Sequence, residues 1–448
     1  MSRYDNYKDS GVEWIGEIPE GWRSLMIKRL SPVKRGASPR PIDDPKYFDT
    51  DGEFAWVRIA DVSASERYLE NTTQTLSELG ASLSVKRYPG DIFLSIAGTV
   101  GKPIISKIKC CIHDGFVYFP KLKINPEYLY YLFSTGLPYQ GLGKWGTQLN
   151  LNTDTVGEIV IPIPSNNEMS DVVAFLDRKT AEIDQLIANK EKLIALYEEE
   201  KTAIINRAVT RGLPSTSSGQ VPLEVKTKPS GVDWLGDIPE HWEVKRLKYF
   251  ASKVGSGVTP KGGASVYQLD GIPLLRSQNI HFSGLKMDDV AYITQETHDD
   301  MGNSKVMSGD VLLNITGASI GRCYFVDETL GEANVNQHVC IIRPTTAIGA
   351  KFLYYLLRSD VGQKQIDIEQ TGSGREGLNF ESLKKFVLPV PERTEQSAIV
   401  THIETECARL DTIIEKFKKQ IELFKEYRTT LISEVVTGKI DVRGEVGV

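Results

Sequence analysis

The sequence has few residues of the kinds that bind metals or form disulfide bonds. Its 448 residues include five cysteines and six histidines, and no two cysteines stand in a C-x-x-C spacing. Common zinc sites and redox motifs need such pairs. We therefore expect no metal site and no disulfide framework, and we read the cysteines as the reduced thiols of a cytoplasmic protein.

Long hydrophobic runs are also missing. No stretch approaches the roughly 20 apolar residues that a membrane-spanning helix needs, and the polar N-terminal residues do not resemble a signal peptide. Hydrophobic residues make up 40% and charged residues 25% of the chain, which are ordinary globular values. The sequence predicts several folded domains and no association with a membrane.

Motifs for catalysis are weak. Residues 98–102 (GTVGK) have the wrong glycine spacing for a phosphate-binding P-loop, and Pro103 stands where that motif has Ser or Thr. Residues 125–128 (NPEY) lack the second proline of the amino-methyltransferase N-P-P-[FY] box and are typical of a helix start. No H-E-x-x-H pattern occurs. We expect a binding protein without catalytic residues.

The strongest signal is a duplication. Residues 10–22 read SGVEWIGEIPEGW and residues 230–242 read SGVDWLGDIPEHW, with nine of thirteen positions identical. We call these two segments the W-boxes. Further pairs follow in the same order, which identifies the chain as two copies of one large unit. These pairs are GASPR at 36–40 with GVTPK at 257–261, Gly-Asp at 90–91 with 309–310, EYLYYL at 127–132 with KFLYYL at 351–356, and IPIP at 161–164 with LPVP at 388–391.

Each copy ends in a long amphipathic stretch. Residues 168–209 and 395–437 contain neither Pro nor Gly, and their apolar residues recur every three or four positions. Each predicts a helix of about 40 residues, roughly 60 Å long. Neither helix can bury such a stripe alone, so we expect the two to pair like a coiled coil. The alternative is that each helix packs only on its own body. Residues 213–229 are rich in Ser, Pro, Gly and Lys and read as a linker.

Between each W-box and its helix lies a body of mixed α/β character. Residues 91–96 and 310–315 look like buried strands, and residues 128–133 and 352–357 like core helices. The predicted class is α+β. The predicted domains are a W-box segment (1–22), a first recognition body (23–165), a first spacer helix (166–212), a linker with the second W-box (213–242), a second recognition body (243–391), and a second spacer helix with a tail (392–448).

Both bodies begin with a basic segment, although the net charge of the chain is −6. Residues 23–42 hold six basic residues and no acidic one, and residues 244–261 hold five and none. Cationic segments rich in Gly and Ser suit contacts to nucleic-acid phosphates, although a solvated charged face would look similar. The candidate phosphate contacts are Lys34, Arg35, Arg40, Lys253 and Lys261.

Polar residues on matched loops are candidate base readers. Gln278 and Asn279 follow Arg276, and Arg58 and Asp61 occupy the corresponding place in the first body. Amide and guanidinium groups of this kind suit adenine and guanine edges in the major groove. A second matched pair of loops adds Thr147, Gln148, Ser373 and Arg375. For each residue the alternative is a turn former that bonds only to local backbone.

With these features, the chain resembles the DNA-specificity subunit of type I restriction–modification enzymes. The W-boxes, the segment 257–261, the LPVPERTEQ entry at 388–396 and the stretch 427–443 (YRTTLISEVVTGKIDVR) carry the resemblance, which covers essentially the whole chain. Asn166, Asn167 and Met169 depart from the family's usual Pro or Arg and Gln. The resemblance implies two target recognition domains, each reading half of a split site on double-stranded DNA, and two spacer helices.

The resemblance also implies partners. Two methyltransferase subunits would dock on the helices, and two translocase–endonuclease subunits would join them. S-adenosylmethionine, ATP and Mg²⁺ would belong to those partners, so none is expected on this chain. Two other classes of function stay open from the residues alone. One is a stand-alone methyltransferase or nuclease, and the other is a scaffold that binds only protein.

Overall fold

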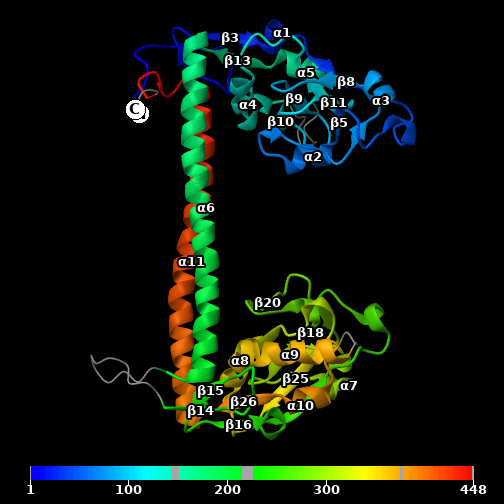
Figure 1. The fold of residues 1–448 in the computed structure, drawn as a ribbon, viewed down its shortest axis with the longest axis vertical. Coiled ribbons are helices and arrows are strands. Elements are labelled where there is room, and N and C mark those ends of the chain that lie inside the picture. The colour runs from blue at the N-terminus through cyan, green and yellow to red at the C-terminus, as the bar shows by residue number, and fades with distance from the viewer. Residues whose placement is uncertain (1, 143–150, 214–225, 374–376, 446–448) are drawn as a thin grey trace. The chain divides into compact units, whose positions relative to one another are not determined.

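The structure is a computed structural model of residues 1–448. It describes residues 2–142, 151–213, 226–373 and 377–445, without the side chains of 371–373. The chain divides into two units (Figure 1). The first unit comprises residues 1–191 and 418–448, and the second comprises residues 192–417. Each unit therefore contains one W-box, one body and parts of both long helices.

The first unit opens with the W-box, in which β1 (Tyr7–Asp9) pairs antiparallel with β2 (Glu17–Pro19). Strand β3 (Arg23–Met26) then pairs with β13 (Val160–Ile163), so the two ends of the body meet. Between them lie two sheets. Their strand orders are β4-β12-β9-β10-β6 and β7-β5-β11-β8.

The bounds of these strands are Lys34–Arg35 for β4, Phe54–Val57 for β5, Tyr68–Leu69 for β6, Thr75–Leu76 for β7, Val85–Arg87 for β8, Ile92–Ser95 for β9, Pro103–Ser106 for β10, Cys110–Ile112 for β11 and Phe116–Tyr118 for β12. The helices are α1 (Ile27–Leu30), η1 (Pro45–Tyr47), α2 (Ile59–Ala64), α3 (Glu78–Ser82), α4 (Pro126–Ser134), η2 (Leu137–Tyr139) and α5 (Thr153–Glu158). Every residue of β9 and of β11 is buried, as a strand covered on both faces requires.

The second unit repeats this plan. Its W-box hairpin is β14 (Thr227–Pro229) with β15 (Asp237–Pro239), and β16 (Glu243–Arg246) pairs with β26 (Val387–Val390). The sheet order β17-β25-β22-β23 matches β4-β12-β9-β10, and β21-β18-β24 matches β7-β5-β11. Both units contain a matched parallel pair, β11 with β5 and β24 with β18, and the first unit has a second parallel pair, β10 with β6. The shared topology confirms the duplication.

The remaining strands are β17 (Ala251–Ser256), β18 (Ile272–Leu275), β19 (Ile280–His281), β20 (Gly284–Leu285), β21 (Ala291–Ile293), β22 (Val311–Asn314), β23 (Cys323–Phe325), β24 (Asn334–Val335) and β25 (Val339–Pro344). The helices are η3 (Leu247–Tyr249), η4 (Gly263–Val266), η5 (Ser277–Asn279), α7 (Gln295–Asp300), η6 (Gly302–Ser304), η7 (Gly317–Ser319), η8 (Glu328–Leu330), α8 (Ala350–Arg358), α9 (Asp360–Ser373) and α10 (Phe380–Lys385). The predicted strands at 91–96 and 310–315 and the predicted helices at 128–133 and 352–357 are all confirmed.

Both long helices are present, as α6 (Asn166–Arg211) and α11 (Arg393–Val436). They lie side by side (Figure 1), which confirms the predicted pairing. In the first unit Arg428 of α11 forms an ion pair with Asp184 of α6 at 2.9 Å. In the second unit the rings of Tyr197 and Phe417 lie 6.0 Å apart. The helices also contact the bodies, because the core of each unit includes the start of one helix and the end of the other.

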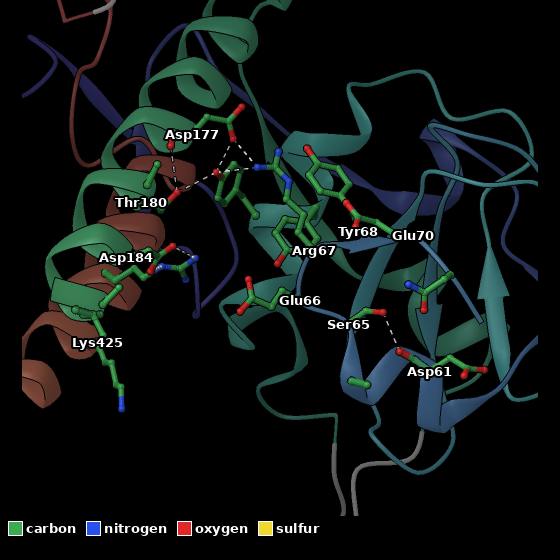
Figure 2. Close-up of a pocket in the computed structure, with 18 of the residues that line it drawn as sticks. Asp61, Ser65, Glu66, Arg67, Tyr68, Glu70, Asp177, Thr180, Asp184 and Lys425 are labelled. Carbon is green, nitrogen blue, oxygen red and sulfur yellow. Dashed lines mark hydrogen bonds and ion pairs between the residues drawn. The ribbon is translucent and has the colours of Figure 1, made fainter. Parts of the chain in front are cut away.

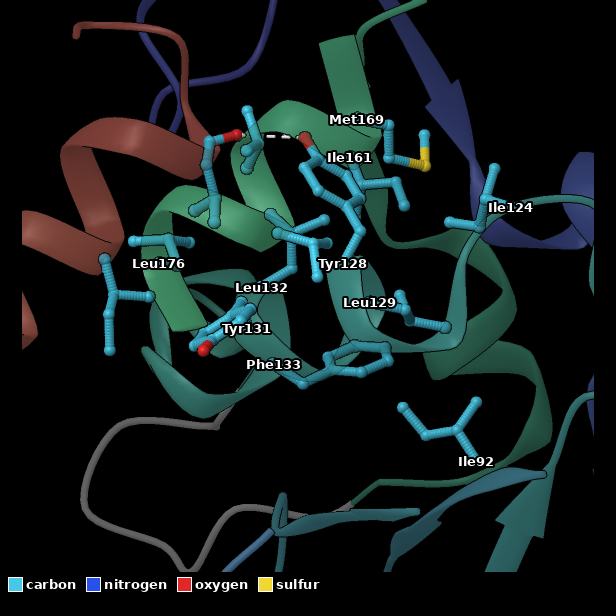
Figure 3. Close-up of a cluster of buried hydrophobic side chains, with 14 of the residues drawn as sticks. Ile92, Ile124, Tyr128, Leu129, Tyr131, Leu132, Phe133, Ile161, Met169 and Leu176 are labelled. Atoms are coloured by element: carbon cyan, nitrogen blue, oxygen red, sulfur yellow. Dashed lines mark hydrogen bonds between the residues drawn. The ribbon is translucent and has the colours of Figure 1, made fainter. Parts of the chain in front are cut away.

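The core of the first unit shows how this contact is made (Figure 3). Tyr128 of α4 is fully buried, and its hydroxyl donates to the carbonyl oxygens of Pro162 (2.9 Å) and Val436 (3.1 Å). Pro162 precedes α6, and Val436 ends α11. A single phenol group therefore ties α4 to the strand that leads into α6 and to the end of α11, and its buried hydroxyl is satisfied.

One local expectation needs correction. Residues 227–229 were expected in the linker, but they form β14, because their backbone groups pair with residues 237–239 of the W-box. The unusual Met169 does not disturb the start of α6. It is buried in the core, and the hydroxyl of Ser165 accepts from the Glu168 N–H at 3.3 Å. At the matched position Gln396 is buried and accepts from the Gly349 N–H at 2.7 Å.

Candidate nucleic-acid interface

The turns that follow β5 and β18 have the same construction. The backbone N–H of Arg58 donates to the Asp61 carboxylate at 2.8 Å. The backbone N–H of Arg276 donates to the Asn279 amide oxygen at 2.9 Å. In each body the residue three positions after the arginine thus caps a short helix and fixes the arginine backbone. The match predicted between these two places is present in the structure.

Asp61 and Asn279 are buried at these turns. The Asn279 amide nitrogen also donates to the Lys286 carbonyl oxygen at 2.8 Å. Both side chains therefore serve as turn formers, because their polar groups already bond inside the chain. Their sequence-based assignment as base readers stays a prediction that this geometry does not favour.

The two arginine side chains and Gln278 reach further out. The Arg58 side chain is 43% exposed and lies 3.8 Å from the Asp61 carboxylate. Arg276 donates to the Asp289 carbonyl oxygen at 2.7 Å. The exposed Gln278 donates to the Asp289 carboxylate at 2.5 Å. Gln278 is exposed beside its turn, and the two arginine side chains are partly exposed.

The basic segments are pressed against a second pair of turns. The backbone N–H of Gly36 donates to the Phe116 carbonyl oxygen at 2.9 Å. The backbone N–H of Gly257 donates to the Val339 carbonyl oxygen at 3.3 Å. A Cβ on Gly36 would collide with the His113 carbonyl oxygen, and one on Gly257 would collide with the Val335 carbonyl oxygen of β24. Only glycine allows this approach. It brings the segments 36–40 and 257–261 against the turns 113–115 and 336–338.

These turns are not among the candidates predicted from the sequence. Each has an exposed or half-exposed polar residue at its centre, Asp114 in the first body and Gln337 in the second, between two buried strands. That pattern, a short polar run between apolar runs at matched places in both copies, was the available signal.

The five candidate phosphate contacts differ in their surroundings. Lys34 and Lys261 are exposed, and neither side chain has a hydrogen-bond or ion-pair partner among the described residues. Arg35 donates to the Asp114 carbonyl oxygen, and Arg40 lies 3.2 Å from the Asp114 carboxylate. The Lys253 ammonium donates to the Asn303 carbonyl oxygen at 2.5 Å.

Burial lowers the pKa of the Lys253 ammonium group. The hydrogen bond and the partial burial together give Lys253 a structural contact that Lys34 and Lys261 do not have. The loop residues Thr147, Gln148 and Arg375 lie outside the described residues, as does the side chain of Ser373.

A groove of about 1470 Å³ lies in the first unit, between α2 and the two long helices (Figure 2). Arg67 reaches across it to Asp177 of α6 at 2.5 Å, and it also binds Glu127 of α4. In the second unit, Lys351 and Glu404 stand at the positions that match Glu127 and Asp177. They form an ion pair with each other directly, at 2.6 Å. An ion pair therefore braces each body against the helix that follows it.

The described residues include no cluster of three or more His, Cys, Asp or Glu side chains that could hold a metal ion. All five cysteines are free thiols. None of the helices in the described ranges combines the length and the apolar character that a bilayer span needs.

One pattern runs against the expectation that catalytic motifs are weak. Residues 317–321 (GASIG) match the G-x-S-x-G pattern of serine hydrolases. However, Ser319 follows an antiparallel strand and precedes another strand, whereas the hydrolase elbow joins a strand to a helix. Its hydroxyl accepts from the Asn314 amide at 3.1 Å. The match therefore does not place Ser319 in a hydrolase site.

Comparison with known proteins gives a consistent result. Residues 19–195 and 239–423 match the family model described as the type I restriction modification DNA specificity domain. The MjaVIII type I specificity subunit of Methanocaldococcus jannaschii is 23% identical over 360 residues, covering 79% of this chain and 77% of its own length. The EcoKI specificity subunit of Escherichia coli K12 is 20% identical over 449 residues, covering 95% and 90%.

Among solved structures, a chain from a study of type I R-M complex assembly and conformational transition shares the fold. Its TM-score is 0.67 at 14% identity, and the alignment covers 94% of this chain and 99% of that one. The two family matches take in both bodies and most of both long helices. The protein therefore belongs to the family of type I restriction–modification DNA specificity subunits, and it carries the family's domain twice.

Proposed function

We propose that this chain directs a type I restriction–modification complex to a bipartite, asymmetric site on double-stranded DNA. The observation that carries this proposal is that the two bodies keep one framework and differ in its polar residues. At the surface Asp114 corresponds to Gln337, and inside the turns the buried Asp61 corresponds to Asn279. A homodimer of identical readers would favour a palindrome. Two diverged bodies on one chain favour two different half-sites.

Within each body, we assign base contacts and phosphate contacts to different residues. Arg58, Arg276 and Gln278 are the proposed base readers of the turns after β5 and β18, because Gln278 is exposed and both arginine side chains are partly exposed beside those turns. Asp61 and Asn279 position these turns from inside. The proposed phosphate contacts are Lys34, Arg35, Arg40 and Lys261, with Lys253 as a weaker candidate. Thr147, Gln148, Ser373 and Arg375 stay predicted readers.

The long helices are the proposed spacer and the docking place for partners. Neither α6 nor α11 contains Pro or Gly, so each runs as one continuous rod. Large apolar side chains stay exposed on them, such as Leu186 of α6 (46%) and Leu423 of α11 (53%) in the first unit. Exposed apolar side chains favour contact with other proteins. We propose that two methyltransferase subunits dock there and that two translocase–endonuclease subunits join them.

S-adenosylmethionine, ATP and Mg²⁺ then belong to those subunits, and the complex acts in the cytoplasm, where the free thiols stay reduced. The chain itself contributes recognition and assembly and does not need a catalytic group of its own.

The test is binding of duplex DNA by the purified complex of this chain with its methyltransferase subunit. We expect affinity for DNA that falls steeply as the salt concentration rises, because phosphate contacts release counterions. A complex that forms but binds DNA at no salt concentration would favour the protein-only scaffold. Transfer of methyl groups or cleavage of DNA by the isolated chain would favour the stand-alone enzyme.

A further inference from the structure

The turns 113–115 and 336–338 have equivalent conformations in the two bodies. In the first, the Gly115 N–H donates to Nδ1 of His113 at 2.8 Å. In the second, the His338 N–H donates to Oδ1 of Asn336 at 3.1 Å. In both turns, therefore, the backbone N–H of the third residue donates to the side chain of the first residue. It leaves the middle residue at the surface, where it is half-exposed in the first body and exposed in the second.

The middle residue is tied to the basic segment in the same way in both bodies. The hydroxyl of Ser38 donates to the Asp114 carboxylate at 3.5 Å. The hydroxyl of Thr259 donates to the Gln337 amide oxygen at 2.5 Å. Ser38 and Thr259 hold the same place in the matched segments GASPR and GVTPK. In both bodies a hydroxyl group thus orients the middle side chain of the turn, although that side chain is Asp in the first body and Gln in the second.

In the second body, Gln337 keeps a specific set of free hydrogen-bonding groups. Its oxygen can accept two bonds and its nitrogen can donate two. Thr259 uses one acceptor, and His338 Nε2, 3.0 Å from the amide nitrogen, uses one donor. The other ring nitrogen of His338 lies 2.7 Å from the Thr316 hydroxyl, which holds the ring in place. One acceptor on the oxygen and one donor on the nitrogen therefore remain for another partner. If the amide were turned over, so that its oxygen and nitrogen changed places, one acceptor and one donor would still remain.

We infer that Gln337 is a specificity-determining residue that reads adenine in one half-site, an inference that rests on the proposed function. Adenine offers its N7 acceptor and its N6 amino donor in the major groove, which is the complement of one donor beside one acceptor. Thr259 and His338 act as positioning residues, because they fix the amide before DNA arrives and reduce the entropy lost on binding. Neighbouring Lys261 lies in the same segment and is exposed for a phosphate contact.

The first body presents a different pattern at this position. Asp114 offers only acceptors when ionised, and one of its oxygens is paired with Arg40 at 3.2 Å. Arg40 is 74% exposed, so its free donors can extend beyond the carboxylate that holds it. The two bodies therefore read different base edges at matched turns, which agrees with an asymmetric target.

The experiment uses the complex of the full chain with its methyltransferase subunit and a library of randomised duplex DNA. Bound duplexes are sequenced for the wild type and for Gln337→Ala, Gln337→Glu and Thr259→Val. For the wild type we expect two half-sites, one of which contains an adenine that Gln337→Ala no longer selects. The loss of discrimination at that base is expected to be on the order of 10- to 100-fold, as for one bidentate pair.

The other variants sharpen this test. Gln337→Glu keeps the shape but replaces the free donor with an acceptor, so selection should move from adenine toward cytosine, whose N4 amino group is a donor. Thr259→Val should weaken selection at the same base only. Gln268→Ala, at an exposed glutamine of the same body, is the control and should leave all positions unchanged.

The outcomes separate this inference from the proposed function. If the wild type selects two half-sites and Gln337→Ala and Gln337→Glu select the same bases with the same strength, Gln337 does not read DNA and the proposed function stands. If the wild type enriches no sequence, the proposed function itself fails, and the inference fails with it. Retained selection in the other half-site shows that a variant is folded.

Discussion

Trp242 donates its indole N–H to the Glu395 carboxylate at 3.0 Å, which fixes the second W-box to the start of α11. The same ring lies against the end of α6, where a Cβ on Gly212 would come within 3.3 Å of it. In the first unit Trp22 takes the corresponding place, 3.1 Å from the Cβ position of Gly438 after α11. The second W-box therefore closes a junction between the start of α11 and the end of α6, and the first W-box lies against the end of α11.

Glu395→Ala is expected to destabilise the second unit. The substitution removes the acceptor for the buried Trp242 N–H and the partner of His241, whose ring nitrogen lies 2.8 Å from the carboxylate. A buried donor left without a partner costs about 1–3 kcal/mol. Urea unfolding of the full chain measures the change. Glu392→Ala is the control, because Glu392 is an exposed glutamate beside the same helix. Equal unfolding free energies for both variants would show that the Trp242 bond does not stabilise the junction.

The free energy of unfolding of the first unit is expected to depend on pH through the protonation of His113. Burial lowers the pKa of this imidazole, while the neighbouring Asp114 carboxylate opposes the shift and Arg35 adds to it. A folded pKa below the unfolded value means that the folded state resists protonation. The contribution of neutral His113 is therefore complete above the ordinary pKa of about 6.5, and it is lost as the pH falls through the lower folded value.

The matched variant for this prediction is His113→Asn, which takes the residue found at position 336 in the second copy. Asn can still accept the Gly115 N–H but does not titrate. We expect the wild type to lose unfolding free energy relative to the variant as the pH falls below about 6.5. Urea unfolding from pH 7.5 to 5 measures this difference. Parallel stability curves for the two proteins would exclude a contribution from His113.

Lys261→Ala and Lys253→Ala are expected to change the salt dependence of DNA binding by different amounts, although both lysines belong to one basic segment. Lys261 is exposed, so its loss should weaken binding to all DNA sequences about equally. It should also reduce the slope of log K against log salt by about 1. Lys253 already donates to the Asn303 carbonyl oxygen. Its loss should lower stability and reduce the slope by less than the loss of Lys261 does. Equal slopes for both variants would show that their surroundings do not decide their roles.

Asp61→Asn should preserve the fold and change DNA selection. The amide oxygen can still accept the Arg58 N–H, but the negative charge 3.8 Å from the guanidinium is gone. Selection of bases is then expected to weaken in one half-site only. Asp61→Ala also removes the helix cap and should cost a further 0.5–2 kcal/mol of stability, roughly the value of a cap. The account would be wrong if Asp61→Asn were as unstable as Asp61→Ala.

Residues that repeat with a fixed period could be recognised before the fold was known. The stripes of α6 and α11 are of this kind, because the apolar residues of a paired helix recur every three or four positions. The W-boxes could be recognised because one segment occurs twice. The roles of single polar residues depend on contacts distant in the sequence. Asn279 looks like a base reader beside Gln278, but Lys286 and the turn use its amide. Gln337 could not be identified as a candidate base reader without its contact with Thr259, which lies in another segment of the chain. Residues 227–229 look like linker until their partner strand is seen.

The central claim is that one chain reads two different half-sites held apart by its long helices. The most direct test is a methylation map of DNA from cells that express this chain with its methyltransferase subunit. The account predicts a methylated motif made of two different specific parts separated by a gap of fixed length without sequence preference. A continuous or palindromic motif would contradict it.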